Sequence, residues 1–142
     1  MGNNILALTF PGGKRSTEAV AATAGNVAYN LSPGAGKRWL VLRGIITLTT
    51  DATVADRYVR FSLTDGTNIT NYILVSPTQT ASLAEAYEIG EVLHHHNAYP
   101  GNNAQYVGIR PILLEGADQL RIIVTNGVVG DSYAGFFVVL EL

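Results

Sequence analysis

The sequence predicts an all-β protein, an antiparallel β-sandwich or jelly roll with an extended N-terminal arm. Apolar runs with alternating polar residues recur along the chain from Lys37, and Gly, Asn and Asp turns separate them at short spacing. Residues 37–142 are also about the length that such a domain needs. We therefore divide the 142 residues into an arm, residues 1–36, and a strand-rich domain, residues 37–142.

The arm is rich in Gly, Ala, Asn and Thr. Residues 17–25 are expected to form a short helix with Thr17 as the N-cap and Gly25 as the stop. Ordering the arm costs roughly 1–2 kcal/mol per residue, whereas each large apolar side chain returns only about 1.5–3 kcal/mol on burial. We therefore expect the arm either to stay disordered or to order by strand addition to a neighbouring subunit. The expected interface residues are Ile5, Leu6, Leu8, Phe10, Val27, Tyr29, Leu31 and Trp39.

The first strand of the domain, residues 37–50, is apolar on both faces. Alternation places Trp39, Val41 and Ile45 on one face, and the opposite face is expected to hold Leu40, Leu42, Ile46 and Leu48. Gly44 within this strand indicates a bulge or a close approach of another chain segment. Trp39 is interpreted as a buried sandwich tryptophan, with an interface anchor as the alternative.

Further strands follow along the chain. Residues 58–63 alternate and end at the hairpin signal Asp65-Gly66, and residues 71–76 form the next strand. Residues 80–96 are ambiguous between a helix and an irregular crossing. Residues 104–116 are expected to be a strand with a bend at Pro111. The last two strands are expected within residues 118–127 and 131–142, the former with Leu120, Ile122 and Val124 inward.

The amino-acid composition excludes several classes of function. Hydrophobic residues make up 47% of the chain and charged residues 14%, against roughly a quarter charged in ordinary soluble domains, so part of the surface is expected to be covered by a partner. The net charge of −2 argues against direct binding of nucleic acid. The absence of cysteine excludes thiolate catalysis and disulfides. No apolar run is long enough to span a membrane, and no targeting signal is recognised.

The three histidines, His94, His95 and His96, are adjacent. A metal site would need a further ligand, and the carboxylate that the cupin pattern places after such a pair is missing from "NAYPGNN". We interpret these histidines as a polar loop, with their meeting at an oligomer axis as the alternative. The two Gly-Lys pairs fail the phosphate-loop pattern. The acidic residues read as turn residues, and a pair between Arg57 and Asp51 or Asp56 is expected to be exposed and weak. No catalytic residue, cofactor or metal is therefore expected.

Two long segments resemble a known group of proteins. They are "SPGAGKRWLVLRGIITLTTDATVADRYVRFSL" and "GADQLRIIVTNGVVGDSYAGFFVVLEL". Together they resemble the small β-sandwich structural proteins of tailed bacteriophages, in particular the capsid decoration (auxiliary) proteins of thermophilic siphophages. The resemblance implies a homotrimer that binds the major capsid protein on the outside of the virion and stabilises the shell mechanically. It also implies synthesis in a host cytoplasm, and it involves no catalytic motif.

Two other functions stay open at this point. The first is a receptor- or carbohydrate-binding module of a phage tail or fibre, for which exposed aromatic residues would form the surface. The candidates are Tyr72, Tyr87, Tyr99, Tyr106 and Tyr133. The second is a metal-dependent enzyme of the jelly-roll type, which the incomplete ligand set around the histidines disfavours.

Overall fold

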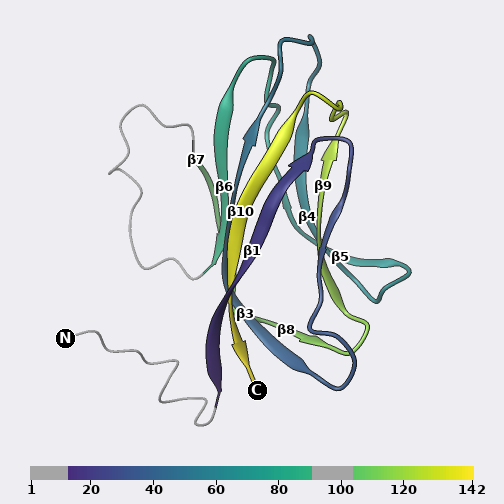
Figure 1. Ribbon diagram of the computed structural model, residues 1–142, viewed down its shortest axis with the longest axis vertical. Coiled ribbons are helices and arrows are strands. Elements are labelled where there is room, and N and C mark those ends of the chain that lie inside the picture. Colours follow the sequence, from purple (N-terminus) through teal and green to yellow (C-terminus); the bar gives the residue numbers. More distant parts are fainter. Residues whose placement is uncertain (1–12, 91–103) are drawn as a thin grey trace, which may run out of the picture.

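The computed structural model describes residues 13–90 and 104–142. Within these residues the chain forms ten strands and no helix, so the all-β prediction is confirmed. The strands are β1 (Lys14–Ala24), β2 (Tyr29–Leu31), β3 (Arg38–Thr49), β4 (Tyr58–Thr64), β5 (Ile69–Val75), β6 (Ala84–Gly90), β7 (Ala104–Gly108), β8 (Ile112–Glu115), β9 (Gln119–Thr125) and β10 (Ser132–Glu141). They build two sheets that face each other (Figure 1).

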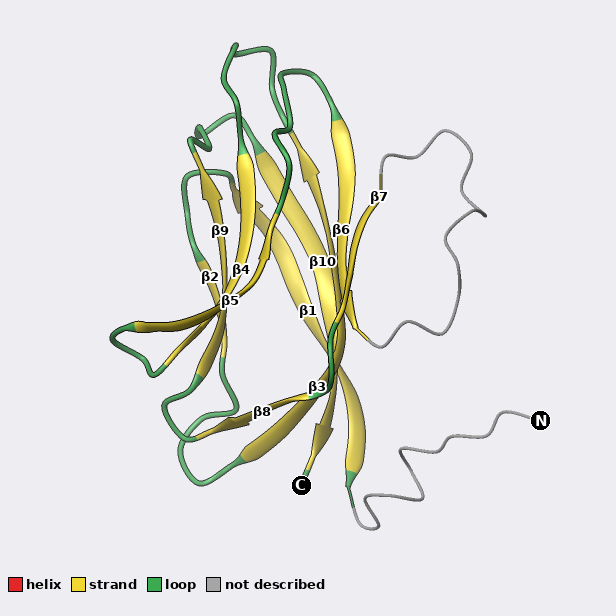
Figure 2. Cartoon of the chain, turned by 180° about the vertical axis from the view of Figure 1, so that it is seen from behind, coloured by secondary structure: helices red, strands yellow, loops and turns green. Residues whose placement is uncertain are grey.

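The larger sheet has the strand order β1-β10-β3-β6-β7, and β8 pairs with the first part of β3. The smaller sheet has the order β2-β9-β4-β5. All pairings are antiparallel except that of β6 with β7, which is parallel. The edge strands of the larger sheet are β1 and β7, and Figure 2 shows β7 beside β6.

The hydrophobic core lies between the two sheets and receives side chains from both. Phe61 of β4 and Phe137 of β10 are fully buried and meet edge to face, with ring centroids 6.4 Å apart. Tyr29 of β2 stacks on the same Phe137 ring at 6.5 Å. These contacts join β2 and β4 of the smaller sheet to β10 of the larger sheet, so the three aromatic rings help to hold the two sheets together.

The alternation expected for the smaller sheet is confirmed. In β4, Val59 and Phe61 are buried, and in β9 the residues Leu120, Ile122 and Val124 are buried. The Asp65-Gly66 turn joins β4 to β5, and Gly66 has a φ of 91°, which a residue with a side chain rarely adopts. The bend at Pro111 is also found, because β7 ends at Gly108 and β8 begins at Ile112.

The expected alternation of β3 is broken by a bulge. The consecutive residues Val138 and Val139 of β10 pair with Arg43 and Val41, which leaves Leu42 as an extra residue in β3. The predicted extent of the strand is confirmed. The prediction that Leu40 and Leu42 share a face with Ile46 and Leu48 is wrong, because the bulge lies between the two pairs. An unpaired residue shifts the period-2 pattern by one position and exchanges the two faces.

The core therefore takes Val41, Ile46 and Leu48 from β3, whereas Leu40 and Leu42 belong to a separate apolar cluster. Gly44 lies on the core side, where a Cβ atom would overlap the ring of Phe137. The interpretation of Gly44 as a site of close approach is thus confirmed, and the approaching group is an aromatic side chain.

The boundary of the N-terminal arm needs correction. β1 pairs along its length with β10, and β2 pairs with β9, so the chain from Lys14 onwards is built into the two sheets. The helix expected over residues 17–25 is wrong, since nearly all of this segment is strand β1. Its helix-favouring alanines are overridden by pairing with a long neighbouring strand. In the same way the ambiguous stretch after Thr80 contains the strand β6.

Candidate functional site

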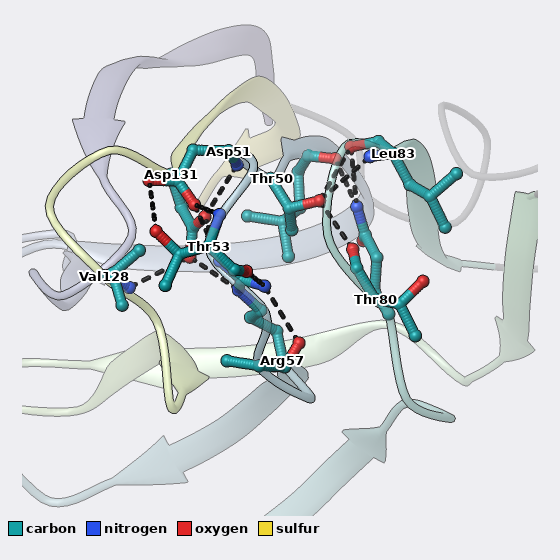
Figure 3. A network of polar contacts seen from close by, with 11 residues as sticks. Thr50, Asp51, Thr53, Arg57, Thr80, Leu83, Val128 and Asp131 are labelled. Atoms are coloured by element: carbon teal, nitrogen blue, oxygen red, sulfur yellow. Dashed lines mark hydrogen bonds and ion pairs between the residues drawn. The ribbon is translucent and has the colours of Figure 1, made fainter.

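The most polar part of the interior surrounds Arg57, whose side chain is fully buried. It lies immediately before β4, at the end of the body where β3 and β9 finish and β4 and β10 begin. Its Nε donates to Asp131 Oδ2 at 3.0 Å, and its Nη2 donates to Asp131 Oδ1 and Asp51 Oδ1, each at 2.9 Å. Nη1 donates to the carbonyl oxygens of Thr53 and Ala55 at 2.7 and 2.9 Å, so all five N–H groups are used (Figure 3).

Asp131 is equally well satisfied. Besides Arg57, the backbone N–H groups of Asp51 and Val128 donate to its two oxygens at 3.0 and 2.9 Å (Figure 3). Burial pushes the pKa of Asp131 up, but the hydrogen bonds from Arg57, Val128 and Asp51 outweigh it and hold the pKa below its ordinary value. The hydrogen bond with Asp131 likewise raises the pKa of Arg57 against the opposing effect of burial.

A second group of polar contacts continues from this pair. The backbones of Arg57 and Gln79 exchange two hydrogen bonds of 2.9 and 2.8 Å. The buried Gln79 amide donates to the carbonyl oxygens of Leu48 and Leu83 and accepts from the Tyr87 hydroxyl at 2.8 Å. Thr50 also bonds the backbone of Leu83 (Figure 3). The network thus ties together three loops, residues 50–57, 76–83 and 126–131.

This network is closed to chemistry. The guanidinium and the Asp131 carboxylate are saturated by each other and by the backbone, and they offer no free acid, base or nucleophile to a substrate. Among the described residues, no group of three or more His, Asp or Glu side chains is placed to hold a metal ion. We interpret the network as structural: it holds the three loops, residues 50–57, 76–83 and 126–131, in fixed positions. The expected pairing of Arg57 with Asp51 is present, but it was wrongly expected to be exposed, and Asp131 was missed.

A second feature is apolar and faces outwards. Leu140 pairs with Leu40, and Leu40 pairs with Leu113, so these three side chains share the side of the larger sheet that faces away from the core. Alternation along β10 adds Phe136 and Val138 to this side. We call the whole set the outer patch: Leu40, Leu42, Leu113, Phe136, Val138, Leu140 and Leu142.

The outer patch has a buried centre and an exposed margin. Leu40, Leu42, Val138 and Leu140 form the centre and are at most 9% exposed. Leu113 is 43% exposed, Phe136 is 36% exposed and Leu142 is 44% exposed. The outward side of a two-layer sheet is usually polar, so these three exposed apolar side chains set the outer patch apart from an ordinary solvent-facing sheet surface.

The structure places the expected interface residues in different environments. Val27 is half exposed in the turn before β2, whereas Leu31 is buried in the core of its own chain. Tyr29 and Trp39 are partly buried and pack against that core, which favours the sandwich interpretation of the tryptophan. Ile5, Leu6, Leu8 and Phe10 lie outside the described residues.

The tyrosines do not form one surface. Tyr87 and Tyr133 are buried, which overturns their assignment to an exposed aromatic surface, whereas Tyr72 is 51% exposed. Tyr106 lies in β7, and Tyr99 lies outside the described residues together with His94, His95 and His96. The loop interpretation of the histidines therefore stays a prediction. The described part of the chain contains no helix that is long and apolar enough to cross a membrane.

Comparison with known proteins adds no relative to this description. No protein-family model, no curated protein and no solved structure matches this chain.

Proposed function

We propose that this protein is a non-enzymatic structural subunit of a virion, which decorates the outside of a capsid as an oligomer and stabilises it mechanically. The observation that carries the proposal is the outer patch of the larger sheet. Its centre of four apolar side chains is buried, and its margin exposes three large apolar side chains to solvent. Covering the exposed parts of Leu113, Phe136 and Leu142 contributes about 1 kcal/mol each.

The strand orders support a jelly roll within the sandwich class. Without β7 and β8, the two sheets read β1-β10-β3-β6 and β2-β9-β4-β5. Successive strands then alternate between the sheets, except that β4 and β5 are neighbours in the smaller sheet, and this is the order that two interlocked Greek keys give. Jelly rolls recur in viral capsid proteins and in lectins, so this topology agrees with the virion proposal by analogy of fold alone.

The Arg57 network supports a mechanical role better than a catalytic one. It fixes the loops at one end of the body, and the Arg57 guanidinium and the Asp131 carboxylate are both fully engaged in it. The outer patch lies towards the other end, where the chain ends beside the first residues of β3. One end of the body is therefore rigid, and the other is suited to association.

Two parts of the proposal, the capsid as the binding partner and the trimer as the oligomer, are supported by the sequence resemblance. The major capsid protein is the proposed partner, and the oligomer is proposed to be a homotrimer. The proposed arm is shortened to the residues before Lys14. Gly13 lies against Leu140, because a Cβ there would come within 2.8 Å of Leu140 Cγ, so this arm would start beside the centre of the outer patch.

The test compares two single substitutions. Leu113→Asp puts a charge into the outer patch, whereas Val54→Asp puts the same charge on a side chain that is 94% exposed in the loop before β4. We expect the wild type and Val54→Asp to form an oligomer by light scattering and to co-sediment with purified capsids stripped of accessory proteins. Leu113→Asp should stay monomeric and remain in the supernatant. A wild-type protein that is monomeric and does not bind capsids would overturn the proposal.

A further inference from the structure

The outward side of the smaller sheet differs in character from the outer patch. The side chains of β4 and β9 that point away from the core are polar, aromatic or basic, with Ile123 as the one aliphatic residue among them. Arg60 of β4 pairs with Ile123, and Arg121 of β9 pairs with Ser62, so the two arginines are diagonal neighbours on this side. Such neighbours lie roughly 7–8 Å apart, which brings two like charges close together.

Neither arginine has an acidic partner. The ion pairs formed within the described residues involve Arg38, Arg43 and Arg57 only, and neither Arg60 nor Arg121 makes a side-chain hydrogen bond there. The outward positions of β4 and β9 hold no Asp or Glu, although the chain has 11 acidic residues against nine basic ones. A cationic pair without a counter-charge, on a protein of net negative charge, attracts an anion from solution.

The flanking aspartates do not neutralise this pair. Asp65, in the turn after β4, accepts hydrogen bonds from the backbone N–H groups of Thr67 and Asn68 at 2.8 and 2.7 Å. Asp118, in the turn before β9, accepts from the backbone N–H of Glu115 at 3.1 Å. Both carboxylates therefore stabilise the turns in which they lie and are not ion-pair partners of Arg60 or Arg121.

Unsatisfied polar atoms gather at the same place. Ser62 is 1% exposed and lies between the arginines in the pairing pattern, yet its Oγ has no hydrogen-bond partner. The Nε atoms of Arg60 and Arg121 and the Oγ1 of Thr125 are also buried without a partner. An unmade hydrogen bond at a buried group costs about 1–3 kcal/mol, so four such atoms on one side of one sheet point to a group that is supplied from outside.

An aromatic ring borders this group of residues. Tyr72 of β5 pairs with Ser62 and is 51% exposed, and the guanidinium of Arg60 lies 6.0 Å from its ring centroid. This cation–π contact holds Arg60 beside the ring and leaves half of the tyrosine in water. A ring of this kind provides an apolar surface with a polar edge for a ligand to stack on.

From these observations we propose that Arg60, Ser62, Tyr72 and Arg121 form a binding site for an acidic saccharide, a sugar that carries a carboxylate. The planar guanidinium groups match a carboxylate with paired hydrogen bonds. The exposed ring of Tyr72 offers a stacking surface for the sugar beside these guanidinium groups. The site is independent of the outer patch and of the proposed role in a virion, because it lies on the other sheet.

The chemistry of this side disfavours the other anionic ligands. An acidic protein partner would be expected to meet an apolar centre surrounded by polar residues, whereas Ile123 is the only aliphatic outward residue of β4 and β9. A nucleic acid would need a basic stripe that neutralises many phosphates, and this side has two arginines on a chain of net charge −2.

The test is a titration of the full-length protein with three probes: trigalacturonate, the neutral sugar maltotriose, and poly-L-glutamate at equal carboxylate concentration. We expect trigalacturonate to bind, with an affinity that falls as salt is added, and the other two probes not to bind. Arg60→Gln and Arg121→Gln should each weaken trigalacturonate binding roughly tenfold or more, as the loss of a charge-assisted hydrogen bond implies. Tyr72→Ala should weaken it as well.

Arg110→Gln is the matched control, since Arg110 is an exposed arginine between β7 and β8 and its loss changes the net charge equally. It should bind trigalacturonate like the wild type. Thermal unfolding of each variant should match the wild type within a few degrees, because the substituted groups make no ion pair. The proposal is overturned if poly-L-glutamate binds as well as trigalacturonate, if Arg110→Gln weakens binding as much as Arg121→Gln, or if trigalacturonate does not bind at millimolar concentration.

Discussion

Arg57 and Asp131 form a doubly hydrogen-bonded ion pair that joins two loops 74 positions apart in the sequence, with both side chains essentially inaccessible to water. The pair connects the loop before β4 to the loop before β10, so it links one strand of each sheet. Because every donor and acceptor is satisfied, the cost of burying the two charges is offset only while both are present.

Removal of one partner should therefore be costly. We expect Arg57→Met to lower the free energy of unfolding by about 3–5 kcal/mol, since it leaves Asp131 buried without its counter-charge. Urea denaturation followed by circular dichroism measures the change. The control is Arg38→Gln, which removes the ion pair with Glu115 between side chains that are 55% and 52% exposed. That loss should stay below about 1 kcal/mol, and equal losses in the two variants would contradict the role given to Arg57.

Acid should weaken the same pair. The pKa of Asp131 lies below its ordinary value of 3.8, so its contribution to stability is complete above that value and is lost as the pH falls through the lower pKa of the folded state. We expect the urea midpoint to decrease with falling pH below about 4. In Asp131→Asn, which is less stable at neutral pH, this dependence should be flatter. An unchanged slope in Asp131→Asn would show that other carboxylates dominate acid unfolding.

Alkaline solution should act through buried tyrosines. Burial raises the pKa of Tyr133 to about 12 and, aided by the charge of Glu85, raises that of Tyr87 further. A raised pKa of this kind stabilises the fold below the ordinary value of 10.0, and the contribution is lost as the pH rises towards the folded-state pKa. We expect tyrosinate absorbance and loss of strand signal to rise together above pH 10. In Tyr133→Phe the loss of stability with pH should be shallower, and an identical pH profile would count against this assignment.

The contact between Gly44 and Phe137 can be tested by adding a single methyl group. Gly44→Ala should destabilise the protein by about 1–3 kcal/mol, because the new Cβ would overlap the buried ring. Thr47→Ala, at an exposed outward position of the same strand, is the control and should change stability by less than about 1 kcal/mol. Thermal unfolding monitored by calorimetry distinguishes the two, and a neutral Gly44→Ala would mean that the ring can move aside.

The sequence was most informative where local rules decide the structure. The period-2 pattern of Val59 and Phe61 and the turn signal Asp65-Gly66 depend on neighbouring residues alone, and both predictions are confirmed. Local propensity predicts a helix where β1 lies, because the pairing of β1 with β10 joins residues more than 100 positions apart in the sequence. Local propensity carries no information about such a partner.

The candidate sites were harder to predict for the same reason. Asp131 and Arg57 meet only after both sheets have formed, and the sequence offered no pattern that joins them. The diagonal placement of Arg60 and Arg121 depends on the register between β4 and β9. The outer patch depends on an irregularity within β3, which alternation alone does not reveal. The low proportion of charged residues predicts a surface covered by a partner, and this stays a prediction.

The extra residue at Leu42 has a consequence for how this chain tolerates insertions and deletions. Loss of one codon there would restore strict alternation and turn Trp39 and Val41 towards the solvent, while Leu40 would enter the interior. A one-residue deletion in the turn after β4 would carry no such inversion. Descendants of this gene should therefore keep an apolar residue at position 42 and leave the number of residues between Arg38 and Gly44 unchanged.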